Sequence, residues 1–169
     1  MATNEVPVID LAAFEQGDHA IRTEISQRTD EACQLTGFIA ITHHGVDQHI
    51  IDNMWNTMQE FFDLPTSVKQ KFNVPFPGYP YGYMGNEAET LAASRGSTTP
   101  PDLKETFNGG PISIPSHISD PEALAFCYAS TPWPSQPETF VQAWTSYYNA
   151  MENLASRIMR LFAEALSLD

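Results

Sequence analysis

The stretch TGFIAITHHGV, residues 36–46, predicts a helix end, a short strand and a tight turn in quick succession. Gly37 comes at the end of a helical pattern, and glycine is favoured just past a helix C-terminus because it adopts a left-handed backbone easily. The apolar run 38–42 is short enough for a buried strand. Residues 43–46 then form the turn, and Asp47 can cap a following helix. The stretch therefore predicts a helix–strand–helix unit.

Amphipathic segments flank this unit on both sides. Residues 19–35, and the segment from the capping Asp47 to its end at Leu64-Pro65, both show a helical pattern of side chains that share one face. The run 6–11 predicts a strand or extended edge segment, since Pro7 is tolerated near the start of a strand. A further turn or two of helix is expected over 66–72. The apolar or small positions of the two helices are Ile21, Ile25, Thr29, Ala32, Cys33, Ile50, Ile51, Met54, Met58, Phe61 and Phe62.

Residues 73–110 have a different character, because glycines and prolines interrupt every regular element and aromatic side chains lie between them. A loop of this length in a compact domain is usually functional or disordered, and its aromatic density favours an ordered loop. Short strands are expected at 81–84 and 105–108. Aromatic walls with both charge signs are typical of sites that bind small polar molecules with an apolar body. The predicted substrate-binding residues are Tyr81, Tyr83, Met84, Arg95 and Phe107.

Each of these residues also has a structural interpretation. Tyr81 and Tyr83 face the same way on a strand, so Tyr83 either lines a pocket or packs in the core. Arg95 either holds a substrate carboxylate or is a solvated loop charge.

The last part of the chain predicts one long helix. Residues 111–137 are rich in proline, and apolar side chains then recur at three- and four-residue spacing from Phe140 to Ala165. A helix of about 30 residues would be about 45 Å long. That is longer than a domain of this size needs, so the helix is expected to support a larger structure.

The composition suits one globular domain: the chain has 169 residues, of which 42% are hydrophobic. A formal net charge of −13 without a basic run disfavours nucleic acid and anionic membranes as partners. We expect neither a signal peptide nor a membrane span, and hence a cytoplasmic protein. Cys33 and Cys127 are expected to be reduced, buried thiols.

The sequence offers neither a metal site nor a nucleophile motif. It contains no His-x-Asp, His-x-Glu or His-x-His, and His43 and His44 would point in opposite directions at a strand end. Gly-x-Ser-x-Gly, Walker and Gly-x-Gly-x-x-Gly motifs are absent as well. No catalytic or metal-binding residue is therefore predicted in these residues.

Six landmarks in order resemble the isopenicillin N synthase-like non-haem Fe(II)/2-oxoglutarate-dependent dioxygenases. His43 departs from this pattern because the family usually has Asn there. The landmarks are VPVIDL (6–11, family pattern (I/V)PxID(L/F)), residues 36–46 (xGFFxxxNHGV), FFDLPTSVKQKF (61–72, FFxLPxExK), Gly82-Tyr83 (GY), DLKETF (102–107, DxKExF) and Trp133-Pro134 (the WP corner).

The resemblance implies an α+β fold. Residues 1–110 would form the N-terminal dioxygenase region, with a substrate-side loop at 73–110. Residues 111–169 would form a proline-rich linker and the long helix that supports a double-stranded β-helix (jelly-roll) core. In this family the iron-binding His-x-Asp and distal His, and the Arg-x-Ser that binds 2-oxoglutarate, follow that helix. Most of the core is thus expected to be missing here. Arg95-Gly96-Ser97 spells Arg-x-Ser but precedes the helix, so that role is not assigned to it.

The function implied by the resemblance is the N-terminal portion of an oxygenase of secondary metabolism. The intact enzyme would use Fe(II), 2-oxoglutarate and O2 to hydroxylate, desaturate or cyclise a small molecule, although some relatives dispense with 2-oxoglutarate. These residues alone would be inactive, and their partner would be the missing C-terminal catalytic half or another chain. The alternative is a non-catalytic truncated relative that acts as a binding or dimerisation module.

Overall fold

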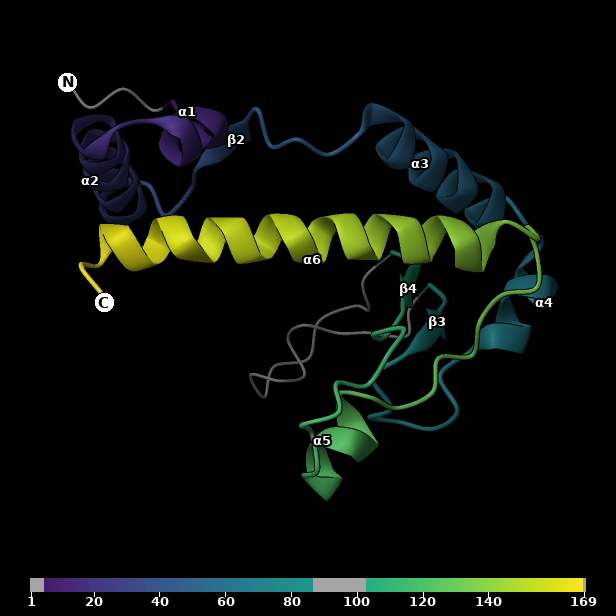
Figure 1. Cartoon of the computed structure of the whole chain (residues 1–169). Helices are drawn as coiled ribbons and strands as arrows, with labels where there is room; N and C mark the ends of the chain where they lie inside the picture. The colour runs from purple at the N-terminus through teal and green to yellow at the C-terminus, as the bar shows by residue number, and fades with distance from the viewer. Residues whose placement is uncertain (1–4, 87–102, 169) are drawn as a thin grey trace. The chain divides into compact units, whose positions relative to one another are not determined.

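The computed structural model describes residues 5–86 and 103–168, which form a mixed α and β fold (Figure 1). Its elements are β1 (Val8–Asp10), α1 (Leu11–Gln16), α2 (His19–Leu35), β2 (Ala40–Thr42), α3 (Gln48–Phe62), α4 (Thr66–Lys69), the 3-10 helix η1 (Gln70–Phe72), β3 (Gly82–Met84), β4 (Thr106–Asn108), α5 (Pro121–Phe126) and α6 (Phe140–Ala165).

The chain divides into two compact units, and α6 contributes to both. The first unit consists of residues 1–48 and 149–169, and the second of residues 49–148. The predicted long helix is confirmed: α6 has 26 residues, about 39 Å of helix. These two units are defined by contacts within the fold, whereas the predicted regions 1–110 and 111–169 were defined by their expected roles. The division into those two regions stays a prediction.

The first unit is built on a parallel pair of strands. β1 and β2 align Ile9 with Ile41. The core residues Ile9, Leu11, Phe14 and Leu161 are at most 3% exposed. The predicted strand over 6–11 is shorter than expected. The reason is that the Asp10 carboxylate caps a helix, accepting a hydrogen bond from the Ala13 amide at 3.0 Å, so α1 begins at Leu11.

The helix end and the turn predicted within 36–46 are confirmed, but the buried strand predicted over 38–42 was wrong in part: β2 has only Ala40–Thr42, and its residues are exposed or half-buried because, among the described residues, no element covers the face opposite to Ile41. Gly37 has a φ of +72°, and its amide donates to the carbonyls of Ala32 and Cys33 at the end of α2. Cys33 itself is exposed, as is Cys127, so the prediction of buried cysteines was wrong. The inward face of α2 carries Ser26, Thr29 and Ala32, and Cys33 is turned about 100° away from Ala32.

Charged side chains clamp the turn after β2. Arg157 contacts the Glu15 carboxylate through Nε at 2.6 Å and Nη2 at 2.7 Å. Its Nη1 also donates to the carbonyl oxygen of His44 at 2.6 Å. The hydrogen bonds with Glu15 raise the pKa of Arg157, and the same hydrogen bonds with Arg157 lower the pKa of Glu15. The loop between β2 and α3 is therefore tied to α1 and to the C-terminal part of α6.

An aromatic core holds the second unit together. Phe61, Tyr83 and Phe140 are at most 1% exposed, and rings from Phe107, Trp133 and Trp144 pack against them. The ring centroids of Phe107 and Phe140 lie 5.0 Å apart at 76°, an edge-to-face arrangement. The short strands expected at 81–84 and 105–108 are confirmed as β3 and β4, and the structure pairs them antiparallel. The apolar stripe of α6 therefore contributes its first turns to this core.

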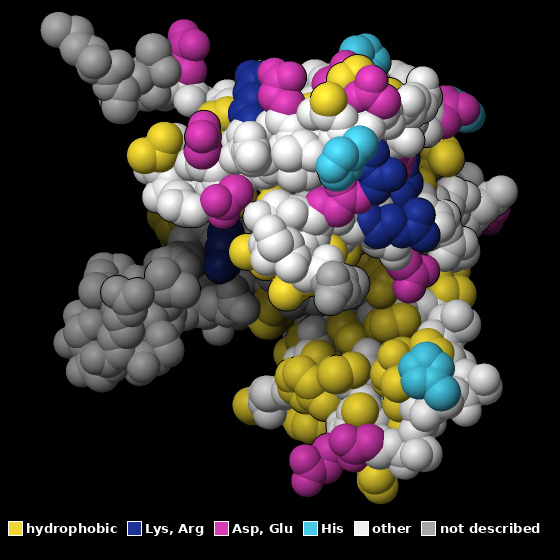
Figure 2. Space-filling view, turned by 60° about the vertical axis from the view of Figure 1, so that its left-hand side comes forward, with side chains coloured by type: hydrophobic (Ala, Val, Ile, Leu, Met, Phe, Trp, Pro, Cys, Tyr) yellow, Lys and Arg dark blue, Asp and Glu magenta, His cyan; other side chains and the backbone are white. Residues whose placement is uncertain are grey.

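The distribution of charged side chains on the surface agrees with the acidic composition of the chain. Figure 2 shows a face on which acidic side chains are scattered and several Lys and Arg side chains lie beside acidic ones, rather than gathering in a basic patch. No helix within 5–86 and 103–168 is long and apolar enough to cross a membrane.

Candidate functional site: the β3–β4 hairpin

The hairpin of β3 and β4 brings three of the predicted substrate-binding residues together. Tyr83 pairs with Phe107 across the two strands, and Met84 follows Tyr83. Tyr83 is 1% exposed, with its ring centroid 6.0 Å from that of Phe61. Met84 and Phe107 are half-buried. Their contact with a substrate stays a prediction.

Tyr81 precedes the hairpin and has a structural contact of its own. Its hydroxyl donates to the carbonyl oxygen of Cys127 at 2.5 Å, and burial raises its pKa. The Tyr79 hydroxyl makes the equivalent contact with the Ser130 carbonyl. The two tyrosines thereby tie the segment before β3 to the segment after α5. Arg95, the remaining predicted residue, lies outside the described residues.

The first residue of β3, Gly82, lies where the backbone leaves no room for a side chain. Its φ is +128°, and a Cβ at this position would lie 2.8 Å from the Val74 amide nitrogen and 3.0 Å from the Phe72 carbonyl oxygen. Both atoms are backbone, so they cannot move aside as a side chain can. The Val74 amide in turn donates to the Tyr83 carbonyl at 3.2 Å. The glycine therefore allows β3 to run close against the chain that follows η1.

A buried ion pair at this hairpin was missed by the sequence interpretation. The Lys69 side chain is 5% exposed, and its Nζ lies 2.6 Å from Oε2 of Glu105. Nζ also donates to the Phe62 carbonyl at 2.7 Å and lies 5.8 Å from the centroid of the Tyr83 ring. In the sequence, Lys69 lies near the end of the helical turns expected over 66–72, where a cation is favourable without any partner. One indication of this pair is present in the sequence: Lys69 and Glu105 both belong to segments that resemble the family, 61–72 and 102–107.

Burial also changes the chemistry of Tyr83. Burial first, and then the nearby Glu105 carboxylate, raise the pKa of Tyr83 to about 12. The raised pKa makes the phenolate form of Tyr83 still harder to reach than in an exposed tyrosine, so this hydroxyl is not suited to act as a base.

Three polar atoms of the second unit are buried without a hydrogen-bond partner among the described residues. They are the Tyr83 hydroxyl, the Thr106 hydroxyl and the Trp144 indole nitrogen. Leaving such groups unpaired costs about 1–3 kcal/mol each. Two of them are hydroxyl groups of the hairpin, which can donate or accept a hydrogen bond, whereas the indole N–H of Trp144 can only donate one.

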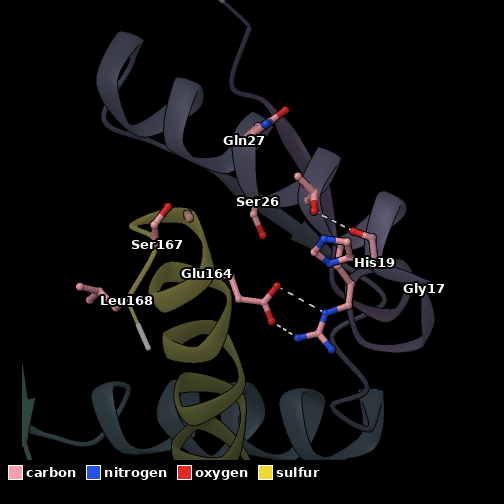
Figure 3. A pocket seen from close by; sticks show the side chains of 10 residues that line it. Gly17, His19, Ser26, Gln27, Glu164, Ser167 and Leu168 are labelled. Carbon is pink, nitrogen blue, oxygen red and sulfur yellow. Dashed lines mark hydrogen bonds and ion pairs between the residues drawn. The ribbon is translucent and has the colours of Figure 1, made fainter.

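The first unit contains a separate polar cavity of about 650 Å³ between α2 and the end of α6 (Figure 3). Arg22 forms an ion pair with Glu164 there, and its guanidinium lies 5.2 Å from the Phe14 ring centroid. The Ser26 hydroxyl is buried and has no partner in the described part of the chain. The cavity lining is Gly17, His19, Arg22, Thr23, Ser26, Gln27, Glu164, Ala165, Ser167 and Leu168. These side chains offer hydrogen bonds but no pairing of a nucleophile with a base.

The described residues do not fit an iron ion. Non-haem iron of this kind needs two imidazoles and a carboxylate held around one point. Residues 5–86 and 103–168 contain no group of three or more His, Cys, Asp or Glu side chains that could hold a metal. His43 instead lies 2.9 Å from the Asp10 carboxylate, and Nδ1 of His44 accepts the Val46 amide hydrogen. Both imidazoles thus serve the turn.

Comparison with known proteins identifies the family. The sequence profile of the non-haem dioxygenase in morphine synthesis N-terminal family matches residues 6–136. The chain belongs to this family. A curated relative, the validamycin A dioxygenase of Streptomyces hygroscopicus subsp. limoneus, is 27% identical over 168 residues, which are 99% of this chain and 45% of that protein. The chain spans less than half the length of the first curated relatives that it matches.

Solved structures share the fold of this family member. A Caulobacter crescentus protein of the 2OG-Fe(II) oxygenase family superposes with a TM-score of 0.76 at 21% identity, over 97% of this chain and 49% of that one. A full-length Neurospora crassa protein, solved in complex with alpha-KG, superposes with a TM-score of 0.74 at 24% identity, over 97% and 48%. At these identities the likeness concerns the fold alone.

Proposed function

We propose that this chain is the N-terminal portion of an Fe(II)/2-oxoglutarate-dependent oxygenase that oxidises a small molecule by hydroxylation, desaturation or cyclisation. One observation carries the proposal: the family profile matches residues 6–136, while the match to a curated dioxygenase covers 99% of this chain and only 45% of that relative.

In the proposed intact enzyme, Fe(II), 2-oxoglutarate and O2 would supply the oxidising chemistry. The residues that hold them would lie in a jelly-roll core beyond those described, because the described residues do not fit the metal. The 169 residues alone should therefore not turn over 2-oxoglutarate. The intact enzyme is proposed to work in the cytoplasm, in secondary metabolism.

The contribution of this segment to the enzyme would be part of the substrate wall. The hairpin carries the half-buried apolar side chains of Met84 and Phe107, and also the buried hydroxyl groups of Tyr83 and Thr106, which have no partner within 5–86 and 103–168. Such a lining suits a small molecule with an apolar body and a few polar groups. Tyr81 and Arg95 complete the proposed substrate-binding set. These side chains would select and orient the substrate rather than take part in the oxidation.

The alternative is a non-catalytic binding or dimerisation module. It is favoured by large apolar side chains that the first unit exposes, including Leu35 (80%), Phe38 (69%) and Met159 (62%). Where such side chains gather into one contiguous patch, they mark a surface that associates with another polypeptide. This module would bind a partner chain without consuming 2-oxoglutarate.

A turnover assay on two proteins separates the two functions. The first protein is this chain, and the second is the product of the complete natural reading frame. Each is incubated with Fe(II), ascorbate and 2-oxoglutarate labelled at C1, and labelled CO2 is collected. The proposal expects release from the longer product and none above the boiled blank from this chain. A longer product that releases no CO2 and also forms defined dimers would contradict the proposal and support the module.

A further inference from the structure

Two charged residues from different landmarks meet beside the hairpin. Lys69 ends α4, and Glu105 lies directly before β4, 36 positions later in the chain. Their side chains are 5% and 22% exposed, and Nζ to Oε2 measures 2.6 Å. This contact therefore joins the two landmarks, 61–72 and 102–107, through one buried ion pair.

An ion pair that is largely removed from water often adds little to the free energy of unfolding. Removing two charges from water is expensive, and replacing such a pair by apolar side chains of similar size is often neutral or stabilising. The best-attested use of a buried polar contact is to select one arrangement among several of similar energy.

The hairpin is an element that needs such a selection. β3 and β4 have three residues each, so their backbone hydrogen bonds alone fix the alignment only weakly, and side-chain contacts must do the rest. Residues 85–105 separate them, far more than the two to five residues of a hairpin loop that sets the register by its own geometry. A slip by one residue would turn Phe107 away from Phe61 and Phe140, to the opposite face of the strand.

The ion pair is compatible with one register. The Lys69 ammonium donates to the Phe62 carbonyl and lies over the ring of Tyr83. These two contacts fix the position of Lys69 relative to β3. Glu105 is two residues before Phe107, so the two side chains share a face of the strand. A one-residue slip moves Glu105 by about 3.3 Å and turns its side chain to the other face, out of reach of Nζ.

We propose that the Lys69–Glu105 ion pair sets the register of the β3–β4 hairpin, with Lys69 as a positioning residue. The pair keeps Tyr83 opposite Phe107. A consequence for the enzyme, which rests on the proposed function, is that the pair decides which hairpin side chains face the substrate.

The test uses the 169-residue chain and measures register separately from stability. The variants are Lys69→Met, Glu105→Met and the two combined. The matched control is Lys71→Met, which removes an exposed lysine two residues away. Thermal unfolding gives the stability of each protein. NMR cross-peaks between the backbone protons of Tyr83 and those of residues 106, 107 and 108 report the register of the folded fraction.

Glu105→Met leaves the buried Lys69 ammonium unpaired, and its Tm should fall by roughly 6–20 °C; Lys69→Met leaves the partly exposed Glu105 carboxylate unpaired, and its Tm should fall by less. The double variant should regain most of the loss seen in Glu105→Met, yet show cross-peaks from Tyr83 to Thr106 or Asn108 besides those to Phe107. The control should keep both the Tm and the Tyr83–Phe107 cross-peaks alone. A double variant that retains only the Tyr83–Phe107 cross-peaks overturns the proposal, and so does one as unstable as Glu105→Met. Neither result depends on 2-oxoglutarate turnover, so this proposal and the proposed function can fail separately.

Discussion

Gly82→Ala is the substitution for which the structure gives the sharpest stability prediction. Two costs combine at this position. A φ of +128° is outside the range that a side chain tolerates, which costs about 1–3 kcal/mol. The added Cβ would also lie 2.8 Å from the Val74 amide nitrogen, and relieving such a contact by backbone shifts costs a further 1–3 kcal/mol or so.

Gly78→Ala separates these two costs. Gly78 also has a positive φ, +87°, but a Cβ there would meet no atom within 4 Å. It should therefore show the backbone cost alone, about 1–3 kcal/mol. Gly82→Ala should lose roughly 2–6 kcal/mol, which corresponds to a Tm lowered by about 4–24 °C for a chain of this size.

Thermal unfolding followed by circular dichroism, with urea unfolding as the second measurement, decides between these expectations. Gly82→Ala should be less stable than Gly78→Ala by about 1 kcal/mol or more, because only Gly82 has backbone atoms where the Cβ would lie. Equal losses for the two variants would mean that the chain after η1 does not run close against β3, and would refute this prediction.

Three further changes test other contacts. Arg157→Gln should lower stability by about 1 kcal/mol at neutral pH, because the Glu15 pair is partly exposed. Since Arg157 lowers the pKa of Glu15, that contribution is present above the ordinary glutamate pKa of about 4.3 and is lost as pH falls through the lowered value; unfolding of both proteins at pH 7 and pH 2.5 should show the difference shrink. Gly109→Ala places a Cβ 2.6 Å from the Trp144 ring and should cost about 1–3 kcal/mol with a change in tryptophan fluorescence, whereas unchanged emission and Tm would contradict this packing. Ser167→Gly relieves a φ of +54° just past α6 and should raise the Tm by a few degrees in calorimetry; a lowered Tm would disprove the strain.

Local signals in the sequence were sufficient for most elements. The end of α2 at Gly37 and the periodic stripe of α6 depend on neighbours within a turn or two, so they can be predicted from a single sequence. The helix α1 was missed because its cap, Asp10, also continues an apolar run that favours a strand. The burial of Cys33 was predicted wrongly because the helical spacing does not determine which of two adjacent positions, 32 or 33, faces the core.

The candidate site could be predicted only in outline. Aromatic spacing located the two strands of the hairpin, but not the register that sets Tyr83 opposite Phe107. The Lys69–Glu105 pair was out of reach because it joins positions 36 residues apart, and the charge pattern offers Lys69 many other partners. Contacts between residues so far apart in the sequence can be identified only from the folded structure.

The central claim is that this chain is one part of a longer oxygenase, and the most direct measurement is to sequence the natural transcript beyond the codon for Asp169. Our account predicts an open frame that encodes His-x-Asp, a later His and an Arg-x-Ser pair. A stop codon directly after Asp169 would contradict it and leave the non-catalytic module as the function of this polypeptide.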